Sequence, residues 1–164
     1  MQITNLRDMY IAELQEIMSL EAILASAVPL LAEVASHRAL KDMLLQQEDQ
    51  VQMQKRRLNS ILRVHGADPT AHTDQAMQAL VKETRKMLTM VEGADLRDAA
   101  LIASVQKIQH YQIAAYGTAA SLADHLDYRD DRKLLHDSLE EERRVDAALT
   151  KLAKEEVNHH ALAA

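Results

Sequence analysis

The amino-acid sequence predicts an all-α protein, and its composition and its helical periodicity are the two observations behind this prediction. The 164 residues include no Phe, Trp or Cys and only four Tyr, three Gly and two Pro, yet 48 % of them are apolar. A core of Leu, Ile, Val, Met and Ala favours closely packed helices, and so few Gly and Pro leave little material for tight turns. The length suits a single domain, residues 1–164, with a sizeable core.

Four long amphipathic segments and one short one follow from the spacing of the apolar residues. We expect long helices at about 5–33, 37–65, 95–126 and 130–157, with a bend at Pro29 in the first. Residues 67–74 form the clearest linker, and a shorter helix at about 75–91 follows it. Asp95, with Asp98 three residues later, is expected to cap the third long helix. The tail, 157–164, is expected to fray.

The connections between these segments predict their arrangement. Short loops join the first long helix to the second and the third to the fourth, so each pair should form an antiparallel hairpin, while the long connection with the short extra helix crosses the bundle. A shift of 91 positions places the apolar residues of the first hairpin on those of the second, for example Tyr10 on Leu101 and Leu14 on Val105. The sequence therefore predicts a ferritin-like four-helix bundle of two related hairpins.

The composition also limits the classes of function. A chain without cysteine has no disulfides, thiolate metal sites or Cys nucleophiles, and this chain also lacks a Gly-rich phosphate loop. The formal net charge of −6 argues against a nucleic-acid partner, and the longest apolar run, residues 22–32, is too short to span a membrane. The first residues do not resemble a signal peptide. We expect a cytoplasmic protein with neither a nucleic-acid nor a membrane partner.

Three polar residues interrupt the apolar stripes of the long helices. Glu21, Gln112 and Glu142 stand where the three- and four-residue steps of a bundle seam require a core residue. A buried carboxylate is unfavourable unless it is paired, protonated or bound to a cation. Two interpretations stay open: both Glu side chains bond to Gln112, Arg143 or Arg144, or both are ligands of a di-iron or di-manganese site. A register error of one residue would instead place them at the rim of the bundle.

A complete dinuclear site needs four carboxylates and two His from the two hairpins. The candidate metal ligands are Glu21, Asp49, Glu142 and Asp146, with Gln112 and His110 as neighbours. Three residues after Glu48 and Asp49, where imidazoles are needed, stand Val51 and Gln52, and no His follows the Glu residues of 140–142 at that spacing. Amide side chains are weak, neutral ligands. The candidate site is therefore depleted in metal ligands.

Three segments resemble one protein family: MSLEAIL (18–24), QKIQHYQIAAYGTAASLADHL (106–126) and LLHDSLEEERRVDAALTKLA (134–153). They are similar to the YciE/YciF-type proteins, bacterial ferritin-like bundles linked to stress responses. The resemblance implies a homodimer and, in some members, a dinuclear metal centre. By position, the polar residues of the family fall here on Glu21, on Asp49, Gln50 and Gln52, on Gln109, His110, Tyr111 and Gln112, and on Glu140, Glu141, Glu142 and Asp146. Amides thus replace both acids of the third long helix.

The favoured function is a non-enzymatic, stress-associated, homodimeric bundle with a degenerate, metal-free polar core and no cofactor. The alternative is a di-iron or di-manganese protein that binds or oxidises metal at Glu21, Asp49, Glu142 and Asp146. A third hypothesis is an adaptor that buries a helix face against an unknown protein partner.

Overall fold

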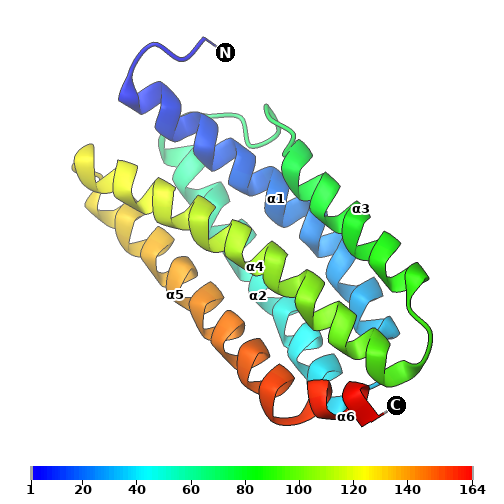
Figure 1. The fold of residues 1–164 in the computed structure, drawn as a ribbon. Coiled ribbons are helices and arrows are strands. Elements are labelled where there is room, and N and C mark those ends of the chain that lie inside the picture. The colour runs from blue at the N-terminus through cyan, green and yellow to red at the C-terminus, as the bar shows by residue number, and fades with distance from the viewer. Residues whose placement is uncertain (1, 164) are drawn as a thin grey trace.

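Two antiparallel helix hairpins make up most of the molecule, which a computed structural model describes for residues 2–163 (Figure 1). Helices α1 (Leu6–Val34) and α2 (Arg38–Val64) form the first hairpin, and α4 (Ala94–His125) and α5 (Arg129–Leu152) form the second. Helix α3 (Gln75–Met90) lies in the long connection and packs against α1 and α4. Residues 2–163 contain no strand, so the predicted all-α bundle with its short extra helix is confirmed.

Local sequence signals fix several of the helix ends. The Asn5 side chain accepts a hydrogen bond from the Asp8 backbone N–H at 2.9 Å and caps α1, while Asp74 caps α3 through the Met77 N–H at 2.8 Å. Gly66 and Gly93 have φ of 64° and 87°, which is left-handed backbone that favours glycine. Gly66 lies just after the end of α2, and Gly93 lies between α3 and α4.

Two details of the prediction are wrong. Gly93, rather than Asp95, occupies the N-cap position of α4, and Asp98 is buried and accepts hydrogen bonds from the backbone N–H groups of Ser36 and His37, at 2.9 and 2.8 Å. The ends of the two hairpins meet here, so Asp98 serves the start of α2 instead of its own helix. Helix α1 continues through Pro29, and the bend expected there stays a prediction.

The chain end is the second difference. A π-helical segment (Ala153–Val157) and a short helix α6 (Asn158–Ala163) continue α5, where a frayed tail was expected. Ala153 and Val157 are buried in the apolar cluster that also contains Leu40 and Leu101. Burial of these two side chains keeps the end of the chain helical because it adds packing that an isolated tail lacks.

The buried stripe of α4 follows the predicted positions only as far as Gln112. Beyond it the buried residues are Tyr116, Ala119, Ala120 and Ala123, while Ala115, Leu122 and Leu126 are half-buried against the core. A straight helix of 3.6 residues per turn drifts by about 20° per heptad against a strict seven-residue repeat. This drift brings Tyr116 to the bundle axis, next to the residues described below.

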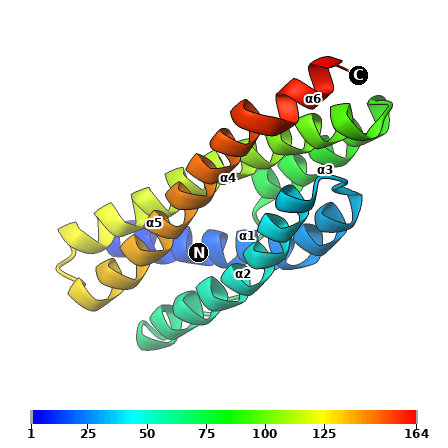
Figure 2. The ribbon, with the colours of Figure 1, turned by 90° about the horizontal axis from the view of Figure 1, so that it is seen from below.

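The helix bounds agree with the internal repeat. A shift of 91 positions moves the end of α1, Val34, onto His125, where α4 ends, and the start of α2, Arg38, onto Arg129, where α5 starts. Figure 2 shows the two hairpins as separate pairs seen from below. The polar groups at mid-bundle therefore lie where two similar hairpins face each other.

Helix α1 is unusually apolar for a bundle helix. Its most apolar 18-residue window has a mean hydropathy of 1.8. By length and composition alone, this helix could cross a membrane, whereas the apolar run at residues 22–32 was too short to predict a membrane span. In the bundle 44 % of that window is buried. Leu6, Met9 and Leu30 are the large apolar side chains that α1 leaves exposed.

Candidate functional site

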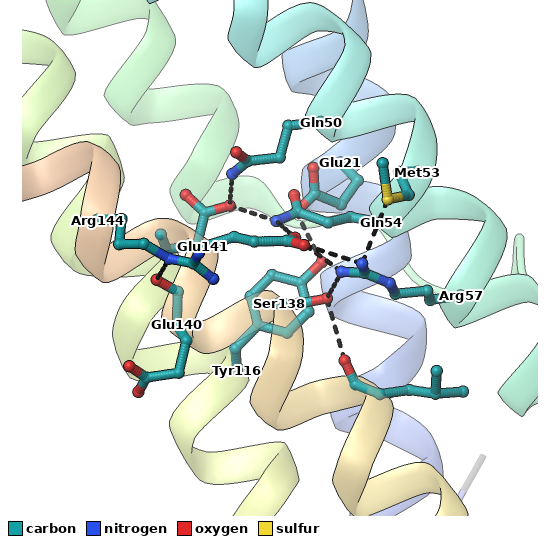
Figure 3. Close-up of polar contacts among 12 residues, drawn as sticks. Glu21, Gln50, Met53, Gln54, Arg57, Tyr116, Ser138, Glu140, Glu141 and Arg144 are labelled. Atoms are coloured by element: carbon teal, nitrogen blue, oxygen red, sulfur yellow. Dashed lines mark hydrogen bonds and ion pairs between the residues drawn. The ribbon is translucent and has the colours of Figure 1, made fainter.

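A network of amide and carboxyl side chains lies at the centre of the bundle, and all four long helices contribute to it (Figure 3). We call it the central network: Glu21 from α1, Gln47, Gln50 and Gln54 from α2, Gln109, Gln112 and Tyr116 from α4, and Glu142 from α5. Every member is buried except Gln50, which is half-buried. Buried polar groups of this number require mutual hydrogen bonds.

Glu142 is the main acceptor of the network. Its Oε1 atom accepts hydrogen bonds from Nε2 of Gln50 at 2.9 Å and from Nε2 of Gln54 at 2.5 Å, and its Oε2 atom accepts one from Nε2 of Gln109. The Gln109 Oε1 atom in turn accepts from Nε2 of Gln47 at 2.9 Å. Three amide donors from two helices therefore surround a carboxylate that is only 1 % exposed.

Glu21 has fewer partners. Its Oε1 atom accepts a hydrogen bond from the Tyr116 hydroxyl at 2.8 Å and a longer one from Nε2 of Gln112 at 3.3 Å. Its Oε2 atom is buried and finds no hydrogen-bond partner within residues 2–163, and the same is true of the Gln54 Oε1 atom. Figure 3 shows Glu21, Gln54 and Tyr116 close together at the centre of the view.

Burial controls the protonation of both acids. It raises the pKa of Glu21 to about 8, and the nearby carboxylate of Glu142 adds to the rise. Burial also raises the pKa of Glu142 to about 7, although the hydrogen bonds from Gln54 and Gln50 oppose the shift. Two carboxylates in one apolar core repel each other when both are charged. Glu21 therefore keeps its proton at neutral pH, and its unpartnered Oε2 atom is a natural position for it.

Arginine is paired outside this core rather than inside it. Arg57 binds the Glu141 carboxylate with two N–H groups, at 2.7 and 2.8 Å, where the network meets the surface. Arg143 pairs with Glu140 at 2.6 Å, and Arg144 donates to the backbone oxygen of Glu140. The expected pairing of the core acids with Arg143 or Arg144 is therefore wrong, whereas the expected bond from Gln112 to Glu21 is present.

The structure brings together only part of the predicted metal-ligand set. Glu21 and Glu142 point into the core with Gln112, as their positions in the seams predicted. Asp49 is exposed on the outer face of α2, next to Gln50, which points inward. Asp146 is half-buried and lies 3.4 Å from the mostly exposed imidazole of His110, on the flank of the bundle. Neither Asp side chain joins the two core glutamates.

Three members of the network were missed at the sequence level: Gln47, Gln54 and Tyr116. The signal for the two amides was present, because Gln47, Val51, Gln54 and Leu58 follow the same four- and three-residue steps as the other seams. An amide in such a step carries no charge and is easily overlooked.

A dinuclear metal centre does not fit these residues. The central network supplies two carboxylates and no imidazole, and no three His, Asp or Glu side chains of the described chain converge as metal ligands would. The cavity beside Gln50, Gln109 and Glu142 has a volume of about 10 Å³, close to the lower limit for one water molecule. The oxygens of Glu142 already accept amide protons. The arrangement is that of a hydrogen-bonded polar core.

Comparison with known proteins places this chain in a family. Residues 5–162 match the family model described as "Domain of unknown function (DUF892)". Protein YciF of Escherichia coli (strain K12) is 35 % identical over 162 residues, which cover 98 % of each chain.

Solved structures agree with the sequence comparison. The crystal structure of the E. coli stress protein YciF superposes with a TM-score of 0.90 at 34 % identity, covering 95 % of this chain and 99 % of that one. YcfI from Rhodopseudomonas palustris superposes with a TM-score of 0.88 at 28 % identity, covering 91 % and 95 %. The chain therefore belongs to the DUF892 family, and it resembles YciF over almost its whole length.

Proposed function

We propose that this chain is a non-enzymatic, stress-associated protein of the cytoplasm whose ferritin-like core holds protons and hydrogen bonds in place of metal ions. The stress association is supported by its similarity to YciF, which is described as a stress protein. The chemistry is supported by one observation above all: both oxygens of Glu142 accept hydrogen bonds from amide N–H groups, three in all.

The role proposed for the central network is to hold the two hairpins in one arrangement. Glu142 of the second hairpin bonds Gln50 and Gln54 of the first, and Glu21 of the first bonds Gln112 and Tyr116 of the second. A buried polar network of this kind penalises any packing of the helices that leaves one of its members unpaired. Its contribution is to the specificity of the fold more than to its stability.

The second candidate function is a metal protein that binds iron or manganese through Glu21 and Glu142. The unpartnered Oε2 atom of Glu21 favours it, because a buried oxygen without a donor is a free ligand position. Asp49 and Asp146 would have to move inward to complete such a site.

Metal analysis separates the two candidates. The protein is produced in medium supplemented with iron and manganese, purified without chelator, and measured by plasma mass spectrometry beside a Glu21→Gln/Glu142→Gln variant. We expect well under one metal ion per chain in both, and no rise in melting temperature on addition of Fe²⁺ or Mn²⁺. Roughly two ions per chain that the variant loses would overturn the proposal, and such binding should stabilise the fold by a few kcal/mol, as a rough estimate.

The homodimer is part of the same proposal. It is expected from the resemblance to the YciF-type family, and light scattering on the purified chain measures it directly. Nucleic-acid and membrane partners are not part of the proposal, since the net charge of −6 disfavours phosphate groups as ligands.

A further inference from the structure

Met53 is an exposed methionine whose sulfur accepts a hydrogen bond from a cation. It lies on the outer face of α2, and 45 % of the residue is exposed. The Nη2 atom of Arg57 donates to the Met53 Sδ atom at 3.2 Å (Figure 3). Residues four positions apart are neighbours on the surface of a helix, so the contact is local to α2. Among the side chains of residues 2–163, no other methionine sulfur accepts a hydrogen bond.

The Arg57 guanidinium is anchored on its other sides. Its two Nη atoms donate to the two oxygens of Glu141, at 2.7 and 2.8 Å, and Nη1 also donates to the Ser138 Oγ atom at 3.1 Å. One N–H group of Nη2 is therefore left for the sulfur of Met53. A thioether is a weak acceptor, so this N–H of a charged group has a poor partner.

Oxidation of the sulfur supplies a better partner at the same place. A sulfur lone pair attacks hydrogen peroxide, the S–O bond forms as the O–O bond breaks, and the second oxygen leaves as water, so that the thioether is oxidised and the peroxide is reduced. The product, methionine sulfoxide, is polar and carries an oxygen acceptor. Because Arg57 is anchored to Glu141 and Ser138, an outward shift of the exposed Met53 side chain makes room for this oxygen.

We propose that Met53 is a site of oxidation by hydrogen peroxide at which Arg57 binds the oxygen of the sulfoxide. Arg57 keeps its bonds to Glu141, whose Oε2 atom also accepts from Gln54 of the central network at 3.3 Å, so the oxidation leaves the core intact. Met77 is the contrasting case. It is fully buried in an apolar cluster, where a sulfoxide would be a polar group without a donor.

Peroxide treatment followed by peptide mass spectrometry and urea denaturation tests this proposal in the wild type, Met53→Leu and Met90→Leu. Met90 is the matched control, because it is 67 % exposed and its sulfur accepts no hydrogen bond within the described residues. We expect Met53 sulfoxide in the wild type at a peroxide dose that leaves Met77 unmodified. The methionines that remain are oxidised alike in all three proteins, so the variants isolate the replaced residue.

The oxygen bound by Arg57 should be visible in the urea midpoint. On oxidation the midpoint of Met53→Leu is expected to fall by about 0.5 M more than that of the wild type, which gains one charge-assisted hydrogen bond at Met53. Met90→Leu should fall like the wild type. In an Arg57→Lys background, which lacks the planar fork, Met53→Leu should make no difference to the fall. Circular dichroism checks the folding of each variant.

The proposal is wrong if Met53 stays unmodified while Met9 and Met87, which are less exposed at 38 % each, are oxidised. It is also wrong if oxidation lowers the midpoint of the wild type as much as that of Met53→Leu, because Arg57 then does not bind the oxygen. A difference that persists in the Arg57→Lys background would assign the effect to another donor. Should Arg57→Lys fail to fold, the comparison of the wild type with Met53→Leu still decides.

Discussion

Glu142 illustrates, at the scale of one residue, how an apolar core can tolerate a carboxyl group. Its two oxygens accept N–H groups from Gln50, Gln54 and Gln109, and each donor reduces the penalty of removing the charge from water. The donors are neutral, so a neutral acceptor of the same shape could take the place of the glutamate. This possibility leads directly to a test.

Replacement of Glu142 with Gln is expected to leave the free energy of unfolding at pH 7 unchanged or to raise it by up to about 3 kcal/mol. The new amide can accept from Gln50 and Gln54, and a joint flip of the Gln109 and Gln47 amides lets it donate to Gln109. Urea denaturation measures the change. Glu142→Ala is the contrasting variant, because it removes the acceptor shared by Gln50, Gln54 and Gln109 and should cost about 2–4 kcal/mol. A loss above about 1 kcal/mol in Glu142→Gln would show that the charge itself is needed.

Single residues were predictable from the sequence where a helical period constrained them. The inward direction of Glu21, Gln112 and Glu142 followed from their places in the seams, and the structure confirms all three. The charge of Asp49 and its position in the family pattern predicted a metal ligand, but its side chain lies on the exposed face of α2. Neighbouring residues of a helix point in directions about 100° apart. An acid that lies one position away from the buried stripe therefore points to another face of the helix.

At the scale of the helices, the connection between α1 and α2 depends on a residue from the other hairpin. Asp98 of α4 binds the backbone N–H groups of Ser36 and His37 ahead of α2, whereas the side chain of Asp95 forms no hydrogen bond within the described residues. His37, at the N-cap position of α2, has no side-chain cap bond of its own. Asp98 therefore holds the start of the second hairpin against the turn of the first.

Asp98→Ala is expected to destabilise the protein by about 1–3 kcal/mol, since it removes two charge-assisted bonds and leaves buried donors. Asp95→Ala, three residues earlier on the same helix, is the control and should change stability by less than about 1 kcal/mol through the helix dipole alone. Thermal unfolding of both variants measures the difference. Equal losses would mean that Asp98 acts only as an acid near the start of α4.

Helix ends were predictable only where the signal is local. Gly66, Gly93 and Asp74 mark ends by their own backbone or side chain, and the bounds near them agree with the sequence within a few residues. The role of Asp98 and the helical chain end could not be predicted in this way. Both depend on contacts between segments more than 50 positions apart, such as Asp98 with Ser36 and Val157 in the cluster of Leu40.

At the scale of the whole molecule, the two hairpins exchange polar contacts across the bundle axis. The shift of 91 positions relates the helix bounds of the two hairpins and places Glu21 on Gln112, but it does not relate the other polar residues: Glu142 corresponds to Val51, and Tyr116 corresponds to Ala25. Each hairpin therefore carries acids whose donors lie mainly on the other. The repeat could be predicted from the apolar positions, while this division of donors and acceptors required the structure.

The two raised pKa values make the stability of the whole bundle depend on pH. Both acids have ordinary values of 4.5, while in the folded chain the pKa is about 8 for Glu21 and about 7 for Glu142. Between pH 4.5 and 8 the unfolded chain has released these two protons and the native chain still holds them, so the free energy of unfolding falls as the pH rises. Below pH 4.5 both states are protonated and the two acids have no effect on stability. Above pH 8 the full penalty is present.

We therefore expect the Glu21→Gln/Glu142→Gln variant to match the wild type in stability near pH 4 and to exceed it by a few kcal/mol, as a rough estimate, near pH 9. Denaturation at a series of pH values, with the wild type and the variant side by side, removes the contribution of all other titrating groups from the difference. Each single variant should remove only part of the slope, with Glu21→Gln acting up to the higher pH. A difference that stays constant from pH 4 to pH 9 would mean that the two core acids ionise as they do in water, and the hydrogen bonds of the central network would then have to stabilise two full charges.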